Sequence, residues 1–240
     1  MKIVLVFPFY NEATSLRKYM PEIIDGLGIF NCQFVLIDDV STDSTLEILE
    51  ELKEHYSNVM VLKNKVNLGH GPTVVKGLKF ALSQKPNLVI SCDGDGEVKV
   101  ADFQKAIHTF RESNVEILEG TRKQRNFDYL RFIVSAVARI IVLIKSGRSS
   151  KDANTPFRAY KPEVLEKLLS AIPNSTLIPN IWISIHSRKL GSKIYQIDIY
   201  PDTSIQSVFH GSSWTAKTRL GSRIKFMRFA FKSFMQILKF

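Results

Sequence analysis

The chain has 240 residues, of which 45% are hydrophobic and 23% are charged, and it contains 12 glycines and 9 prolines. These proportions exclude a disordered, collagen-like or low-complexity chain and favour one large globular domain, with or without an appendage. The formal net charge of +10 indicates an anionic partner, for which nucleic acid, an anionic membrane surface and a phosphate-rich substrate are alternatives.

Short β-branched runs alternate with longer amphipathic stretches in the N-terminal half, a pattern typical of repeated βα units on a mostly parallel sheet. The predicted strands are Ile3–Phe7, Phe34–Ile37, Val59–Leu62, Leu88–Ser91 and Val115–Glu119. The predicted helices are Glu12–Gly26, Ser44–His55, Pro72–Ser83 and Ala101–Arg111. We therefore assign the core to the α/β class.

The pattern changes after Asp128, where a long amphipathic stretch runs to Lys145 and is followed by a polar hinge and a mixed segment. Its most apolar part, Phe132–Ile144, falls short of the roughly 20 residues that span a bilayer. The apolar run at the amino terminus is too short for a signal peptide. The two cysteines, Cys32 and Cys92, predict neither a disulfide framework nor a CxxC metal site. These features favour a reducing cytoplasm and no transmembrane anchor.

The C-terminal stretch Arg223–Phe240 has a cationic sector and an apolar sector on a helical wheel. A basic amphipathic helix of this kind is typical of a membrane interface. Packing on the domain or on a sister subunit explains the pattern equally well, so a homo-oligomer stays an alternative. We expect a domain at residues 1–215 and a helical tail at residues 216–240.

Polar clusters follow four of the predicted strands. They are Tyr10–Glu12, Asp38–Asp39, Asn67–Gly71 and Asp93–Glu97. Ligands of open α/β sheets bind beyond the carboxyl ends of the strands, so we expect these clusters to converge on one rim.

Asp93, Asp95 and Glu97 come directly after an apolar strand at a spacing of two residues, so in extended backbone they project to the same side. The glycines between them, Gly94 and Gly96, would let a bulky anionic ligand approach closely. Carboxylates in this arrangement can hold Mg²⁺ or Mn²⁺ and leave coordination positions for substrate phosphates. The spacing does not fit an EF-hand loop, and the alternative is an acidic turn without a ligand.

Two further motifs allow either a ligand-binding or a structural interpretation. Asp38 and Asp39 end the second strand, where a carboxylate could bind a nucleobase or ribose or could cap the following turn. Gly69–Val74 follows a strand and opens a helix, as a phosphate loop does. Val74 stands where a dinucleotide fingerprint has its third glycine, so we do not expect a nicotinamide or flavin enzyme.

Basic residues follow the fifth strand. Arg122, Arg125 and Arg131 form either a solvated basic face or a clamp on a diphosphate or an acceptor phosphate. No Ser-His-Asp or Cys-His arrangement is evident from the spacing of these residue types.

Six ordered segments together resemble family 2 glycosyltransferases with the GT-A fold, and most of all the polyprenyl-phosphate sugar transferases of the dolichyl-phosphate mannose synthase type. The segments are VFPFYNEATSL, VLIDDVSTDST, NKVNLGHGPTVVKGLKFAL, CDGDGEV, EGTRKQR and KDANTPFRAYK. The resemblance covers residues 1–191 and implies a mostly parallel, Rossmann-like sheet flanked by helices, followed in this chain by the C-terminal basic amphipathic helix.

The resemblance also implies roles for individual residues. The nucleotide sugar would be bound by Pro8, Tyr10, Glu12, Asp39, Gly69 and Asp93. The divalent cation would be held by Asp93, Asp95 and Glu97, the last of which stands where relatives often have Gln. The catalytic residues would be Asp95, Arg122, Arg131 and Asp152. The two arginines would bind phosphate oxygens, and Asp152 with Phe157-Arg158-Ala159 would border the acceptor site.

The sequence departs from the family in two places. Ser207–Trp214 replaces the usual Arg-x-x-Gly-x-Ser segment and has no arginine at the corresponding position, so His210 or Lys217 would have to supply that diphosphate contact. The C-terminal transmembrane helices of many relatives do not follow. We therefore expect peripheral attachment to the inner face of the membrane through the basic tail.

These observations predict an enzyme, namely a metal-dependent inverting glycosyltransferase that uses Mg²⁺ or Mn²⁺. It would move one sugar from a nucleoside-diphosphate sugar to a polyprenyl phosphate. An alternative acceptor is a hydroxyl of an envelope polysaccharide or a lipid-linked glycan. A non-catalytic nucleotide- or nucleic-acid-binding protein is a third hypothesis. We expect no nucleic-acid partner, because aromatic residues are not interleaved with basic residues in the N-terminal half.

Overall fold

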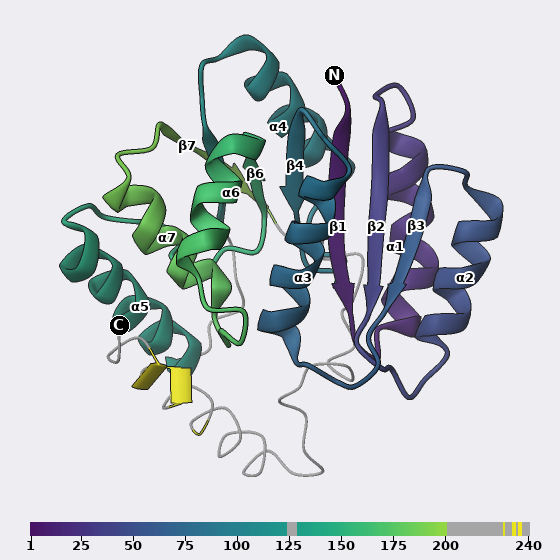
Figure 1. Ribbon diagram of the computed structural model, residues 1–240, viewed down its shortest axis with the longest axis horizontal. Helices are drawn as coiled ribbons and strands as arrows, with labels where there is room; N and C mark the ends of the chain where they lie inside the picture. The colour runs from purple at the N-terminus through teal and green to yellow at the C-terminus, as the bar shows by residue number, and fades with distance from the viewer. Residues whose placement is uncertain (124–128, 201–227, 229–231, 234, 237–240) are drawn as a thin grey trace.

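The computed structural model describes residues 1–123, 129–200, 228, 232–233 and 235–236. In this part of the chain, seven strands form one sheet with helices on both of its faces (Figure 1). The strands are β1 (Ile3–Phe9), β2 (Cys32–Asp38), β3 (Val59–Lys63), β4 (Leu88–Ser91), β5 (Ile117–Arg122), β6 (Arg158–Tyr160) and β7 (Ile194–Ile199). The helices are α1 (Ala13–Gly26), α2 (Thr45–His55), α3 (His70–Ser83), α4 (Val100–Glu112), α5 (Tyr129–Ser146), α6 (Pro162–Ala171) and α7 (Pro179–Lys189).

The strand order is β3-β2-β1-β4-β6-β5-β7, and every neighbouring pair is parallel except those that involve β6. Strand β6 is antiparallel to both β4 and β5. Because β6 is antiparallel to both of its neighbours, β4 and β5 run in the same direction. Strands β1, β2, β4 and β5 therefore all end at the same edge of the sheet. The predicted mostly parallel α/β sheet is confirmed.

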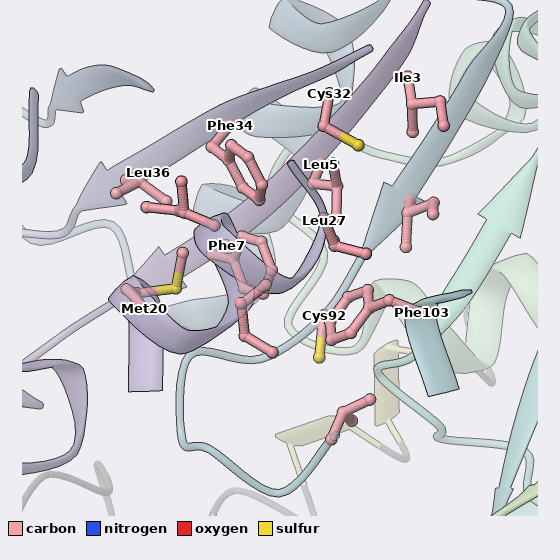
Figure 2. Close-up of a cluster of buried hydrophobic side chains, with 14 of the residues drawn as sticks. Ile3, Leu5, Phe7, Met20, Leu27, Cys32, Phe34, Leu36, Cys92 and Phe103 are labelled. Atoms are coloured by element: carbon pink, nitrogen blue, oxygen red, sulfur yellow. The ribbon is translucent and has the colours of Figure 1, made fainter. Parts of the chain in front are cut away.

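The side chains of β1 alternate between two cores, one on each face of the sheet. Ile3, Leu5 and Phe7 pack with residues of α1, α2 and α4 in the core drawn in Figure 2. Val4 and Val6 face the other core, which α3, α5, α6 and α7 cover. Burial on both faces explains why this strand is a continuous apolar run. Both cysteines are buried, and both belong to the first core.

The structure confirms the strands and helices predicted for the N-terminal half, with shifts at their ends. Strand β1 continues to Phe9, and α3 begins at His70 instead of Pro72. Strand β5 spans Ile117–Arg122 and therefore begins and ends later in the chain than the predicted strand Val115–Glu119. Arg122 thus lies inside the strand. The mixed segment before Tyr200 resolves into β6, α6, α7 and β7.

Five residues of the predicted tail helix are described, and all five are helical. Gln236 contacts the segment before α7, because its Oε1 accepts a hydrogen bond from Leu177 N at 3.0 Å and its Nε2 donates to Ser175 O at 3.3 Å. This part of the tail therefore contacts the domain. The boundary at residue 215, the segment at 207–214, Arg125 and Lys217 lie outside the described residues. Among the described helices, none is long and apolar enough to cross a bilayer.

Candidate active site

The predicted site residues lie mostly in the loops after β1, β2 and β4, at one edge of the sheet. These loop residues are Tyr10, Glu12, Asp39, Asp93, Asp95 and Glu97. Pro8 lies inside β1, Gly69 directly before α3, Arg122 at the end of β5 and Asp152 in the loop between α5 and β6. Arg131 lies in the first turns of α5, and its side chain is outside the described part.

Hydrogen bonds join the loops after β1 and β2. Asn11 has a φ of 55°, in the left-handed region that asparagine tolerates better than most residues. Its Oδ1 accepts a hydrogen bond from Thr42 N at 2.7 Å. Glu12 N donates to Thr45 Oγ1 at 2.9 Å. These contacts fix the backbone of Glu12 at the rim of the sheet.

The first of the two acids at the end of β2 caps a turn. Asp38 accepts hydrogen bonds from Val40 N at 3.1 Å and from Ser41 N at 3.2 Å. The turn holds Val40 at a φ of 62°, which is strained for a β-branched residue. For Asp38, the structure therefore supports the structural interpretation.

The second acid, Asp39, anchors the loop that precedes α3. Its carboxylate is buried and accepts hydrogen bonds from Leu68 N and Gly69 N, each at 2.8 Å. It also accepts one from Asn64 Nδ2 at 2.7 Å. Lys76 Nζ donates to the other end of that amide, Asn64 Oδ1, at 2.6 Å. The structure thus shows Asp39 shaping the predicted phosphate loop, while its contact with a nucleotide stays a prediction.

Asp95 is the most strongly perturbed acid of the rim. Its pKa is raised well above the usual range. The largest cause is the loss of water around its buried carboxyl, and the smaller cause is repulsion from Glu97 and Asp93. A hydrogen bond from Glu97 N to Asp95 Oδ1 at 3.1 Å opposes this shift. Gly94 lies against the ring of Phe9, so that a Cβ at this position would be 2.2 Å from Phe9 Cε1. Only glycine lets the acidic loop lie this close to β1.

The chemistry of these carboxylates fits a divalent cation that would be bound through one or two protein ligands. In residues 1–123, 129–200 and the short described tail pieces, no three His, Cys, Asp or Glu side chains are placed to enclose a metal ion. Asp93, Asp95 and Glu97 nevertheless repel one another in a half-buried loop, and a cation would remove that repulsion. Mg²⁺ and Mn²⁺ sites often use few carboxylates and complete the coordination with water and substrate phosphates.

Two further groups lie near Asp93. Burial raises the pKa of Glu12 to about 7, the hydrogen bond from Ser15 lowers it, and the charges of Asp93 and Asp43 add to the rise. His70 Nε2 lies 3.5 Å from Asp93 Oδ1. His70 is not among the predicted site residues, although its place beside Gly69 in the sequence was an available signal.

Arg122 and Asp152 form a two-point ion pair on the other side of the site. Arg122 Nε donates to Asp152 Oδ2 at 2.7 Å, and its Nη2 donates to Asp152 Oδ1 at 3.1 Å and to Asn154 O at 3.0 Å. Only 11% and 15% of the two side chains are exposed. Burial lowers the pKa of Arg122, but the carboxylates of Asp152, Glu97 and Asp93 hold it above its ordinary value.

A pocket connects the acidic loop to this ion pair. It is lined by Cys92, Asp95, Glu97, Val98, Arg122, Pro156, Phe157 and Ile199. The cavity is small and mostly apolar, and its lining includes two carboxylate residues of the acidic loop and the Arg122 guanidinium.

Arg158 requires a correction to its predicted place. It is fully buried in β6 instead of bordering an acceptor site, and its Nη1 donates to Glu119 Oε1 at 2.6 Å. Its neighbour Phe157 does line the pocket. The role of Glu119 as a partner of Arg158 was not predicted, although a charged residue inside an apolar strand was an available signal.

The model of the family described as Glycosyl transferase family 2 matches residues 4–169. The chain belongs to this family. The match extends from β1 into α6 and therefore contains the acidic loop, Arg122 and Asp152. The membership expected from the six ordered segments is confirmed.

Curated relatives of this glycosyltransferase family 2 chain include an uncharacterized protein of Methanocaldococcus jannaschii, MJ0544. It is 30% identical over 174 residues, which are 69% of this chain and 74% of that protein. Dolichyl-phosphate beta-glucosyltransferase ALG5D of Trichomonas vaginalis is 26% identical, over 69% of this chain and 55% of its own length. Undecaprenyl-phosphate 4-deoxy-4-formamido-L-arabinose transferase of Proteus mirabilis is 25% identical, over 74% and 54%. The chain thus spans about half the length of the two named transferases.

Solved structures of glycosyltransferases share the fold. Glucosyl-3-phosphoglycerate synthase of Mycobacterium tuberculosis, in complex with uridine diphosphate, has a TM-score of 0.65 at 14% identity, covering 99% of this chain and 79% of that one. The mannosyltransferase PcManGT of Pyrobaculum calidifontis, in complex with GDP-Man and Mn²⁺, has a TM-score of 0.63 at 14% identity, covering 100% and 64%. The predicted GT-A fold is confirmed.

Proposed function

We propose that this chain transfers one sugar from a nucleoside-diphosphate sugar to the phosphate of a polyprenyl phosphate, with inversion at the anomeric carbon and with Mg²⁺ or Mn²⁺. Family membership supports the reaction class. Two relatives bear names that specify dolichyl phosphate and undecaprenyl phosphate as acceptors. The observation that carries the proposal is the ion pair between Arg122 and Asp152.

The ion pair favours a phosphate acceptor over a hydroxyl acceptor. A hydroxyl needs a general base within hydrogen-bond reach, whereas a lipid phosphate is already an anion near neutral pH. Asp152 is the leading base candidate outside the acidic loop, yet both of its oxygens accept hydrogen bonds from Arg122. A carboxylate held by a guanidinium is a poor proton acceptor, because taking a proton would break the charge pair. Asp152 is therefore suited to orienting Arg122.

Arg122 is suited to binding the acceptor phosphate. A guanidinium has five N–H donors, and the hydrogen bonds to Asp152 and Asn154 occupy those on Nε and Nη2. Its Nη1 donors would bind a phosphate oxygen, and Arg131 would add a second cation from the start of α5. The pair is preformed, so little side-chain entropy would be lost when the acceptor binds.

The donor would occupy the opposite side of the pocket. Pro8, Tyr10 and Glu12 would line the nucleotide, with Gly69 and Asp93 close to its phosphates. Asp39 would contribute by holding the backbone of the loop before α3 in place. Direct contact between Asp39 and the nucleotide stays a prediction.

The reaction would be a single displacement. A phosphate oxygen of the acceptor attacks the anomeric carbon while the bond from that carbon to the donor diphosphate breaks, and the nucleoside diphosphate leaves with the electron pair. Asp93 and Asp95 would hold the cation, and Glu97, which is not placed with them to enclose an ion, would contribute its negative charge from the same loop. A bound Mg²⁺ or Mn²⁺ supplies charge stabilisation for the leaving diphosphate.

An anionic membrane surface on the cytoplasmic side is the proposed location of the acceptor. Helix α5 begins beyond the strand that carries Arg122 and exposes an apolar face, made of Phe132, Ile133, Val134, Val137, Ile140, Leu143 and Ile144. Arg139 and Lys145 lie on the same helix, and Arg148 follows it. An apolar face accompanied by cations is suited to peripheral binding at anionic lipid headgroups.

A donor and acceptor screen tests the proposal. The purified chain is incubated with single nucleotide sugars, Mn²⁺ and a short polyprenyl phosphate, and release of nucleoside diphosphate is followed with and without the acceptor. We expect release that depends on both the metal and the polyprenyl phosphate. Release that a lipid-linked glycan stimulates, and that polyprenyl phosphate does not, would reject the proposed acceptor in favour of a hydroxyl.

A further inference from the structure

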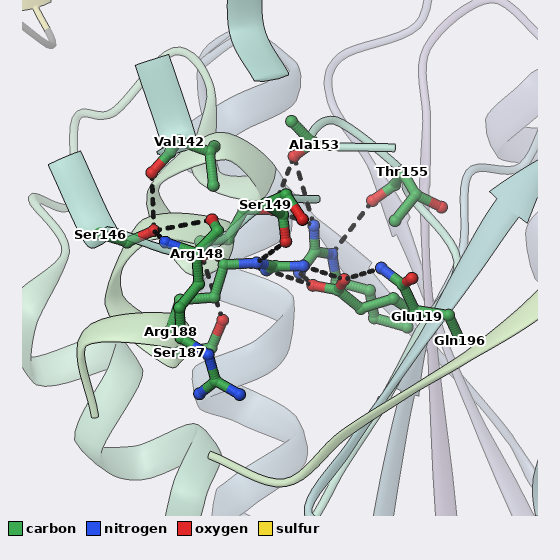
Figure 3. A network of polar contacts seen from close by, with 12 residues as sticks. Glu119, Val142, Ser146, Arg148, Ser149, Ala153, Thr155, Ser187, Arg188 and Gln196 are labelled. Carbon is green, nitrogen blue, oxygen red and sulfur yellow. Dashed lines mark hydrogen bonds and ion pairs between the residues drawn. The ribbon is translucent and has the colours of Figure 1, made fainter. Parts of the chain in front are cut away.

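Three buried charged side chains lie behind the loop that carries Asp152 (Figure 3). They are Glu119 of β5, Arg158 of β6 and Arg188 of α7, which are 1%, 0% and 4% exposed. Arg158 Nη1 donates to Glu119 Oε1 at 2.6 Å, and Arg188 Nη2 donates to Glu119 Oε2 at 2.8 Å. We call these three residues the buried triad. It holds two cations and one anion, so it carries a net positive charge in the interior.

Both arginines also donate to the backbone of the loop between α5 and β6, in addition to bonds from Arg158 Nη2 to Asn180 O and from Arg188 Nη1 to Ser184 O on α7. Arg158 donates from Nε to Thr155 O at 3.2 Å and from Nη2 to Ala153 O at 3.3 Å. Arg188 Nε donates to Ser149 O at 2.9 Å. Residues 147–157 contain no helix or strand, so these carbonyls lack partners from regular secondary structure.

Ser184 of α7 completes the support from the same side. Its hydroxyl accepts a hydrogen bond from Arg158 Nη2 at 2.6 Å and donates to Ala153 O at 2.7 Å. Ala153 follows Asp152 directly in the chain. The backbone next to Asp152 is therefore held by two donors from the interior while the Asp152 side chain binds Arg122.

Stability alone is a weak explanation for this arrangement. Replacing a buried ion group by apolar residues of similar volume is often neutral or stabilising, because the charges have lost their hydration. The triad instead connects three separate elements, β5, β6 and α7, to one irregular loop. Asp152 belongs to that loop, and its partner Arg122 is three residues beyond Glu119 on β5.

We propose that Arg158, Arg188 and Ser184 are positioning residues that hold the 149–155 backbone so that Asp152 orients Arg122 in the pocket. The reaction that this device serves rests on the proposed function, whereas the loop positioning itself does not. Loosening the support should leave the fold and the donor side intact and should displace the ion pair.

Ser184→Ala tests the positioning, with Ser187→Ala as its matched control. Both serines are fully buried on α7, but within the described part of the chain the Ser187 hydroxyl bonds only Ser184 O of its own helix. We expect backbone amide exchange in residues 149–155 to be at least fivefold faster in Ser184→Ala than in Ser187→Ala, with equal exchange in β1 and β4. Equal exchange of residues 149–155 in the two variants would overturn the proposal.

A second variant, Arg188→Lys, tests the positioning of the loop even if Ser184→Ala fails to fold. Arg188→Lys retains a cation beside Glu119 but loses the Nε donor to Ser149 O. Faster exchange at the N-terminal end of the same loop is expected. Unchanged exchange there would contradict the role of Arg188.

A double-mutant comparison connects the positioning to Asp152. We expect Ser184→Ala to lower kcat for sugar transfer about fivefold with the KM for the donor unchanged, and to have no further effect in an Asp152→Asn background. Additive losses would show that Ser184 does not act through Asp152. If no acceptor supports turnover in the wild-type chain, the proposed function fails, while the exchange measurement still decides the positioning.

Discussion

Arg122 Nε lies 2.7 Å from Asp152 Oδ2, although 30 residues separate the two side chains in the sequence. The pair brings the end of β5 together with the loop before β6, and it lies beside a pocket whose other wall is acidic. The proposed function places the cation and the donor diphosphate beside the acidic loop and the anionic acceptor beside Arg122.

The first prediction concerns Asp152. Asp152→Asn should reduce transfer to polyprenyl phosphate by about tenfold at most, because Arg122 keeps its own charge and only loses orientation. Loss of a general base would instead cost about 10²–10⁴-fold. Initial rates at saturating donor measure the effect. Asp198→Asn, which removes an exposed carboxylate paired with Lys123, is the control and should retain full activity.

The second prediction concerns the acidic loop. Asp95→Asn and Asp93→Asn should each abolish metal-dependent turnover without lowering the melting temperature, because each removes repulsion among neighbouring carboxylates. Thermal unfolding and Mn²⁺ titration of donor release measure the two effects. Glu54→Gln, at an exposed position of α2, is the control. Near-normal turnover of Asp95→Asn with the same metal requirement would show that the site assignment is wrong.

The third prediction concerns backbone strain after β2. Val40 has a φ of 62°, and a left-handed conformation costs an L-residue about 1–2 kcal/mol. Glycine avoids that cost but loses about 0.5–1 kcal/mol of backbone entropy. Val40→Gly should therefore leave the free energy of unfolding unchanged or raise it by up to about 1 kcal/mol. Val66→Gly, at an exposed loop position with ordinary φ, should lower it. Equal losses in the free energy of unfolding of the two variants would show that the backbone at Val40 is not strained.

How much the sequence could predict depended on whether the signal was local. The strands and helices before β5 follow from period and punctuation within each segment. Strand β6 has only three residues, and α7 is buried on nearly all sides, so neither has an amphipathic pattern to detect. The acidic loop could be predicted because its three acids lie within five consecutive residues of the sequence.

The partners of the other site residues could not be predicted from sequence. Asp39 accepts hydrogen bonds from backbone groups 29 and 30 residues away, so its structural role depends on how two loops meet. Arg158 was associated with the acceptor because of its place in a motif, but its partners Glu119 and Ser184 come from other elements. Contacts of this kind require the sheet order, which local patterns do not contain.

The fourth prediction concerns Glu119 and pH. Burial raises the pKa of Glu119, but Arg158 and Arg188 outweigh it and hold the pKa below its ordinary value. The carboxylate therefore stabilises the fold above its unfolded pKa of about 4.3, and this contribution is lost as pH falls through the lower folded value. Glu119→Gln should cost about 3–5 kcal/mol at pH 7. Denaturant unfolding should show the difference from wild type narrowing below about pH 4. A difference that is constant with pH would contradict the ion pair.

The fifth prediction concerns the exposed face of α5. Ile144→Ser should weaken co-sedimentation with anionic vesicles, because Ile144 is 76% exposed on the apolar face. Ile29→Ser, at an equally apolar position that is 81% exposed between α1 and β2, should bind like wild type. Both variants should keep their melting temperatures. Equal binding by the two variants would remove α5 from the membrane contact, and a change of oligomeric state in Ile144→Ser alone would assign the face to a second copy of the chain.

The chemical linkage in the isolated product tests whether the chain transfers a sugar to the phosphate of a polyprenyl phosphate with inversion. Product formed from a single nucleotide sugar, Mn²⁺ and polyprenyl phosphate is purified, and its phosphorus and anomeric proton signals are recorded by NMR. We expect a sugar bonded through its anomeric carbon to the lipid phosphate, with the configuration opposite to that of the donor. A sugar bonded to a hydroxyl, or one that retains the donor configuration, would contradict it.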